Sequence, residues 1–367
     1  MAIAQALTSV TRSRAISDKM LFAATFAGFV IWELGGHVDV WYHQHYGFAI
    51  ESFVTWPHAL LYVGWVASAA PAAAYLFESR GLGLPRSAWL PPGYALVLAG
   101  AAAFGLAGGF DLVWHSTLGF EVNHEALVSP SHLGLISSAG LGYFGLLWIT
   151  IDRRSRARSR GFAADLAVAV TLGILFRHAL YALHYAQPFA TDYASGGSIT
   201  GSLFGYAGIT AWQDMTAQVA GTTGIVLYAV LLSLFVVVPL RQLRLGTGAL
   251  TVIVLWNEAW GLVGVPEMWP YLPAVIASAI VCEGIWSAMA LGALGGRDAR
   301  SGYWLIGAAL PWTLFVAYFA LMATLGGGIT WSTPLWAGAP VLAGLYGLVV
   351  AVFAIPPRFA SADIGRS

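Results

Sequence analysis

Histidine and aspartate residues recur at one spacing in the first half of the chain. The two sets are Asp39, His43 and His58, and then Asp111, His115 and His132. In each set the aspartate and the first histidine are four residues apart, so they share one face of a helix. Two imidazoles and a carboxylate could bind a metal ion and leave one coordination position open. The sequence therefore predicts a metal site at the second set and a weaker copy at the first.

The two sets belong to a longer internal repeat. Each reads Asp-x3-His-x3-Gly-Phe, and the matching residues lie at a constant offset of 72 positions. A helix start that carries proline and histidine follows in both copies, after a slightly longer loop in the second. This pattern predicts a duplicated helical hairpin, with repeats at 20–78 and 90–151. The short loop would bring the last histidine of each set beside the first two ligands.

The other histidines have weaker patterns. His178 and His184 could supply a further metal ligand, whereas His45 and His124 are predicted to be solvated loop residues. A single histidine near the end of a membrane span more commonly bonds a neighbouring helix or interfacial water. An aspartate next to a histidine can likewise have a structural role and only orient the histidine ring. The metal hypothesis therefore depends on the duplicated spacing of the two sets.

Charged residues also occur within the apolar segments. Besides the aspartates of the two sets, they include Glu33, Glu258, Glu283 and Arg177. We expect Arg177 to pair with Glu258 or Glu283, in a role that fixes how the helices pack. Ionisable residues inside a membrane are costly and are candidates for function. Acids along a path through the bilayer would also suit a metal or proton transporter, which is the alternative function.

Composition fixes the class of protein. Of the 367 residues, 58% are hydrophobic and 9% are charged, and mean hydropathy is +0.73. Soluble domains are about a quarter charged, so the chain must lie in a lipid bilayer. Segments of about 20 apolar residues predict an all-α, polytopic helical bundle. The ten predicted spans are 20–43, 55–77, 90–114, 130–151, 162–186, 217–240, 248–268, 271–294, 302–325 and 334–355.

Basic residues predict how these spans are oriented. All seventeen lysines and arginines except Arg177 fall in the tails or in alternate loops. The positive-inside rule therefore places both termini in the cytoplasm and the histidine sets toward the outer face of a plasma (inner) membrane. We expect a cytoplasmic tail at 1–19, a single transmembrane domain at 20–355 and a second cytoplasmic tail at 356–367.

One stretch resembles a known family. Residues 111–115, Asp-Leu-Val-Trp-His, followed by 129–132, Ser-Pro-Ser-His, resemble the C subunit of particulate methane and ammonia monooxygenases. That family has Asp-x-x-Trp-His and then Thr-Pro-Ser-His on consecutive helices. The resemblance covers 100–150 well. It implies that Asp111, His115 and His132 are copper ligands in a membrane site linked to oxidation of small, unreactive substrates.

The chain departs from this family elsewhere. The gap between the two histidines is longer, and residues 257–261, Asn-Glu-Ala-Trp-Gly, replace a family stretch that reads Asn-Glu-x-Gly-His. Because Gly261 stands where that histidine would be, a second family metal site is not expected. The N-terminal hairpin and the number of spans also differ.

These observations predict a membrane metal-binding protein, with copper as the metal and zinc as the alternative. Its function would be that of a monooxygenase-type subunit acting on a small or lipophilic substrate. Its partners would be the lipid bilayer and either membrane subunits or further copies of itself. Zero net charge gives no basis for binding nucleic acid. The lone Cys282 excludes internal disulfides and cysteine-rich metal sites, and the ligand spacing fits haem poorly.

Overall fold

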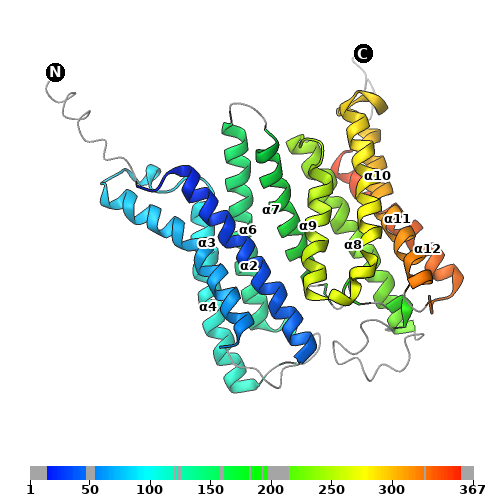
Figure 1. Ribbon diagram of the computed structural model, residues 1–367, viewed down its shortest axis with the longest axis horizontal. Helices are drawn as coiled ribbons and strands as arrows, with labels where there is room; N and C mark the ends of the chain where they lie inside the picture. Colours follow the sequence, from blue (N-terminus) through cyan, green and yellow to red (C-terminus); the bar gives the residue numbers. More distant parts are fainter. Residues whose placement is uncertain are drawn as a thin grey trace, which may run out of the picture. The chain divides into compact units, whose positions relative to one another are not determined.

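The computed structural model of the chain consists of α-helices joined by turns and short 3-10 segments (Figure 1). It describes residues 15–46, 54–119, 121, 125–157, 161–181, 183–184, 186–191, 193–196, 215–325 and 328–356, and these contain no strand. The main helices are α2 (Asp18–Tyr46), α3 (Trp56–Gly81), α4 (Tyr94–Leu118), α6 (Pro130–Arg156), α7 (Phe162–Tyr181), α8 (Met215–Leu243), α9 (Ala249–Gly264), α10 (Leu272–Ala290), α11 (Arg300–Leu325) and α12 (Thr333–Ala354). The short elements are η2 (Arg86–Ala88), α5 (Glu125–Val128), η3 (Tyr193–Ser195), η5 (Pro266–Tyr271) and η6 (Ala293–Gly295).

The predicted spans correspond to these helices. Among the described residues, nine segments are long and apolar enough to cross a membrane, one of them formed by η5 and α10 together. The exception is α9, which has 16 residues where the sequence predicted a span at 248–268. Pro266 cannot continue the helix, and it restricts Val265 before it, so the chain turns into η5. At 1.5 Å per residue, α9 is about 24 Å long, shorter than a hydrocarbon core of about 30 Å.

The outer surfaces of the helices are apolar, as a bilayer requires. On α4, Leu106 is 78% exposed and Val113 is 58% exposed. In the most apolar window of α3 and of α4, only 22% and 28% of residues are buried within the protein. Soluble proteins rarely expose contiguous apolar surface on this scale. The chain is a multi-pass membrane protein with an all-α fold, as the sequence predicted.

The fold divides into two compact units. The first comprises Met1–Asp39, Ile50–Gly119 and Pro130–Arg156, and therefore holds most of α2 together with α3, α4 and α6. The second comprises Val40–Ala49, Phe120–Ser129 and Ala157–Ser367. In it α7 packs on α9, α8 on α12, and α10 between α9 and α11.

Two close helix contacts in the first unit lie at matching positions of the repeat predicted from the sequence. A Cβ on Gly28 of α2 would lie 2.3 Å from the backbone nitrogen of Ser68 on α3. A Cβ on Gly100 of α4 would lie 2.5 Å from the backbone nitrogen of Gly142 on α6. These residues correspond in the repeat, since the first helices match at an offset of 72 and the second helices at 74. Each hairpin therefore has a close contact between its helices at the same place, where the first helix carries a glycine.

Aromatic side chains join the two hairpins. Trp32 of α2 meets Phe104 of α4 edge to face, with ring centroids 4.9 Å apart, and these two residues also correspond in the repeat. Phe29 and Tyr143 complete the cluster, and all four are buried. Such pairs add about 0.5–1.5 kcal/mol beyond the burial of their area. The cluster holds the hairpins side by side, so the ends of α4 and α6 that carry Asp111, His115 and His132 are fixed within one unit.

Candidate metal centre

The last turns of α4 carry two of the predicted ligands on one face. Asp111 and His115 are one helical turn apart, and Asp111 Oδ1 lies 3.2 Å from His115 Nε2. The side chains are 10% and 6% exposed, respectively. A buried carboxylate is costly without a cation or hydrogen-bond donor. The pair therefore has the geometry of two ligands that face one ion.

Gly119 orients the ring of His115. It ends α4 with φ +84° and ψ 179°, a conformation that is essentially restricted to glycine. In this position its N–H donates to the His115 carbonyl, and its own carbonyl lies 3.2 Å from His115 Nδ1. A proton on Nδ1 leaves the Nε2 lone pair directed at Asp111. Histidine ligands in metal proteins are commonly fixed by such a bond from the second ring nitrogen.

The third ligand comes from the start of α6. His132 Nε2 is 3.8 Å from Asp111 Oδ1, and the rings of His115 and His132 are centred 5.4 Å apart. One ligand atom from each residue lies within 4.8 Å of the other two. In a tetrahedral site with bonds of 2.0–2.1 Å, ligand atoms are about 3.3 Å apart. Small side-chain rotations would therefore bring all three within coordination distance of one point.

The hydrogen bonds around Asp111 leave this arrangement incomplete. Its Oδ1 atom is buried, and within the described residues it accepts no hydrogen bond, although two imidazole nitrogens face it. If His115 Nδ1 carries the ring proton, Nε2 and Oδ1 are two acceptors directed at each other. A metal ion, or a second proton on the imidazole, would resolve this contact.

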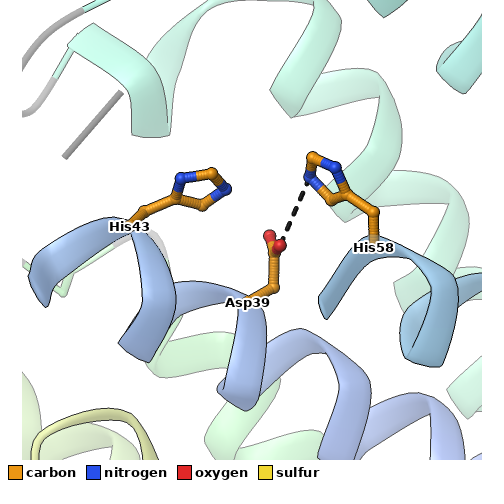
Figure 2. Close-up of side chains that lie close together, drawn as sticks. All are labelled: Asp39, His43 and His58. Carbon is orange, nitrogen blue, oxygen red and sulfur yellow. Dashed lines mark ion pairs between the residues drawn. The ribbon is translucent and has the colours of Figure 1, made fainter. Parts of the chain in front are cut away.

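The first triad has the same layout (Figure 2). Asp39 and His43 are one turn apart on α2, and His58 at the start of α3 has its Nε2 3.3 Å from Asp39 Oδ1. Thr55 caps α3 and accepts from the His58 backbone N–H, which fixes where His58 enters. One ligand atom from each of the three residues lies within 4.8 Å of the others. The Asp39 side chain is 18% exposed, so this carboxylate is more open than that of Asp111, whereas His58 at 19% is less exposed than His132 at 25%.

One aromatic residue beside the triads was not predicted. Tyr62 lies one turn after His58 on α3, and the two rings stack with centroids 6.0 Å apart. The carboxylates of Asp39 and Asp111 both act electrostatically on the Tyr62 phenol. Tyrosines are common near the ends of membrane spans, so nothing in the sequence distinguished this one.

The structure uses the remaining histidines differently. His184 has both ring nitrogens beside amides, with Nε2 2.7 Å from Gln44 Nε2 and Nδ1 3.2 Å from Gln187 Nε2. Neither His178 nor His184 joins a ligand group among the described residues, so a role as reserve ligands gains no support. His45, predicted to be solvated, instead lies in the last turn of α2 with its Nε2 2.8 Å from a Glu267 carboxylate oxygen. His124 lies outside the described residues.

Two of the predicted intramembrane acids, Glu258 and Glu283, lie in the second unit and have different partners. Arg177 acts electrostatically on Glu258, one of its two predicted partners. Glu283 instead accepts hydrogen bonds from the backbone N–H groups of Gly248 and Thr251 at the start of α9. These are N–H groups that a helix leaves without partners in its first turn, so Glu283 serves as a cap.

No family model, curated protein or solved structure matches this chain. The resemblance to the monooxygenase C subunit therefore remains a prediction based on residues 111–132. One departure from that family has a structural counterpart, because a Cβ on Gly261 would lie 2.6 Å from Arg177 Nη1. A histidine at position 261 would require Arg177 to move.

Proposed function

We propose that this protein binds a transition metal within the membrane through Asp111, His115 and His132. The observation that carries the proposal is the convergence of two Nε2 atoms on one buried carboxylate oxygen that accepts no hydrogen bond from the described residues. Gly119 supports it by orienting the His115 ring. A structural aspartate that only orients a histidine would need no second imidazole on the same oxygen.

We further propose copper as the metal and oxidation of a small or lipophilic substrate as the function. Imidazole and carboxylate ligands suit copper and zinc alike, and the resemblance at 111–132 favours copper. Three protein ligands leave one coordination position open, and copper held there would be able to bind dioxygen at that position. The chain's own part is to hold the ion, to fix the His115 tautomer and to surround the site with apolar surface. Leu112 and Val113, between the ligands in sequence, are 47% and 58% exposed on the apolar outside of α4.

The placement of the site in the membrane follows from the arginine pattern. With both termini in the cytoplasm, the end of α4 and the start of α6 would lie at the outer face of the plasma membrane. Substrate and oxygen could then reach the site from the bilayer or from the outer water. The sequence identifies no electron donor, and its single cysteine excludes a cysteine-ligated iron–sulfur cluster.

Metal analysis of the purified protein tests the proposal. The full chain is purified in detergent, loaded with Cu²⁺ or Zn²⁺, passed through a desalting column and measured by elemental analysis. The variants are His115→Ala, His132→Ala and Asp111→Asn, and His178→Ala is the matched control because it changes a histidine outside both triads. We expect each triad variant to lose at least one metal equivalent, and the control to keep the wild-type content.

Copper content equal to that of the wild type in all three triad variants would overturn the proposal. The His43→Ala and His58→Ala variants report separately on the first triad, since removing these histidines can remove only a second metal ion bound there. Circular dichroism and size-exclusion chromatography identify a variant that has failed to fold, and Asp111→Asn then serves as the mildest change. Preference for zinc over copper in direct competition would contradict the copper assignment while leaving the site intact.

A further inference from the structure

A second polar centre lies inside the second unit, on α9. Glu258 is completely buried, and its Oε1 atom accepts hydrogen bonds from the Tyr228 hydroxyl and from the Asn257 side-chain amide. Its Oε2 atom and the Asn257 Oδ1 atom are also buried, and within the described residues neither accepts a hydrogen bond. Leaving a buried acceptor without a donor costs about 1–3 kcal/mol. The centre therefore holds two buried acceptor atoms that receive no hydrogen bond from the described residues.

Arg177 supplies the opposite charge. It lies on α7, is 5% exposed, and acts electrostatically on Glu258. Its guanidinium group rests on Gly261, where a Cβ would lie 2.6 Å from Nη1 and 3.6 Å from Glu258 Oε2. The absence of a side chain at position 261 is what gives the guanidinium this place beside the carboxylate. Arginine stays protonated in proteins, so the ionised pair is neutral overall.

Buried polar side chains lead from this pair toward the segment after α7. Arg177 Nη1 donates to Gln187 Oε1 at 3.4 Å, and Gln187 Nε2 lies 3.2 Å from His184 Nδ1. His184 Nε2 in turn lies 2.7 Å from the side-chain amide of Gln44. Gln187, His184 and Gln44 are each less than 10% exposed. Polar groups are costly in an apolar bundle, and here they form one continuous row from Gln44 to Glu258.

The remaining charged groups around α9 have other partners. From α10, Glu283 is bound to the first turn of α9 by Gly248 and Thr251. From η5, Glu267 is paired with His45. Among the described residues, the ionisable groups that act on Glu258 are Arg177 from α7 and Tyr228 from α8.

Two protonation states of Glu258 satisfy different requirements of this centre. As a carboxylate, Glu258 neutralises Arg177 but leaves two buried acceptors without donors. As a carboxylic acid, it gains an O–H that can donate to a neighbouring acceptor, but it gives up its attraction to the Arg177 charge. A purely structural ion pair would instead saturate its acceptors, as buried polar groups generally do.

We propose that Glu258 is a proton-exchange site, with Arg177 as its fixed counter-charge and Gln187, His184 and Gln44 as its polar connection to the end of α7. The step is a simple proton transfer: hydronium becomes water, the Glu258 carboxylate becomes a carboxylic acid, and no electrons move. The site does not depend on the proposed metal centre, because it uses none of the metal ligands and lies in the other unit. It gives the protein a second activity, which is reversible uptake of a proton inside the membrane.

Infrared difference spectroscopy on the full chain in lipid nanodiscs tests this proposal. The carbonyl stretch of a protonated, buried carboxyl group is followed as pH is lowered, in the wild type and in Glu258→Gln, with Glu283→Gln as the matched control. We expect a pH-dependent band that is lost in Glu258→Gln and kept in Glu283→Gln. Arg177→Gln and Gly261→Ala should both move the midpoint to higher pH, because each removes or displaces the positive charge that favours the carboxylate.

A pH-dependent band that survives in Glu258→Gln would overturn the proposal, as would a wild-type spectrum with no such band across the pH range in which the protein stays folded. A midpoint unchanged in both Arg177→Gln and Gly261→Ala would remove Arg177 as the counter-charge. Gly261→Ala keeps every ionisable group, so it separates displacement of Arg177 from loss of folding in Arg177→Gln. Copper content measured on the same samples shows whether the metal site fails or survives independently.

Discussion

Replacing Gly119 by alanine should weaken metal binding even though position 119 contributes no ligand atom. The backbone there has φ +84° and ψ 179°, which an L-amino acid adopts only at a cost of about 1–3 kcal/mol. Relief of that strain would turn the Gly119 carbonyl away from His115 Nδ1, which it now meets at 3.2 Å. Losing such a supporting bond typically lowers metal affinity about 10- to 100-fold, or about 1.4–2.8 kcal/mol.

The assay is a competition titration of the purified protein against a chelator of known metal affinity, in detergent at constant pH. Gly109→Ala is the control, because Gly109 lies within α4 and an added Cβ there would meet no atom within 4 Å. That change should leave affinity unaltered. The same affinity in Gly119→Ala as in Gly109→Ala would refute the idea that Gly119 orients His115. Equal losses in both would point to a general effect on α4 instead.

Two further predictions concern stability. Gly28→Ala should destabilise the protein by about 1–3 kcal/mol, because the new methyl group would collide with the α3 backbone. Gly36→Ala is the control: its methyl group would meet no atom within 4 Å, so it should be neutral or stabilising in thermal unfolding. The same unfolding temperature in both variants would contradict the packing. Glu283→Gln should cost about 1.5–3 kcal/mol in unfolding free energy, because it weakens charged hydrogen bonds to the start of α9. Glu267→Gln alters a half-exposed pair and should cost about 1 kcal/mol or less, so equal losses would contradict the capping role.

The fold was predictable where the signal is local or repeated. Apolar length alone places the spans, because a bilayer imposes one length scale on every helix. The duplicated spacing predicted that Asp111, His115 and His132 would meet, since one helical turn and one short loop fix their positions. The end of α9 was harder, since apolar residues continue through Pro266 and only the missing N–H of proline stops the helix.

Contacts between distant segments could not be predicted from one sequence. Arg177 had two candidate acids, and the choice of Glu258 depends on the space left by Gly261 on the facing helix. His45 looked like a loop residue, yet α2 continues through it and brings it to Glu267. In each case the partner lies many residues away, and no local pattern records which surfaces come together.

Duplication gives the two triads the same ligands, and burial makes them unequal. The Asp111 side chain is 10% exposed against 18% for Asp39, although His132 is 25% exposed against 19% for His58. Electrostatic attraction strengthens as water is excluded, so a cation gains more at the Asp111 triad. The same exclusion makes an ionised carboxylate more costly to bury there without a cation. Metal should therefore fill the Asp111 triad first, and the Asp39 triad, whose carboxylate is more exposed, should exchange its ion more readily with the surrounding water.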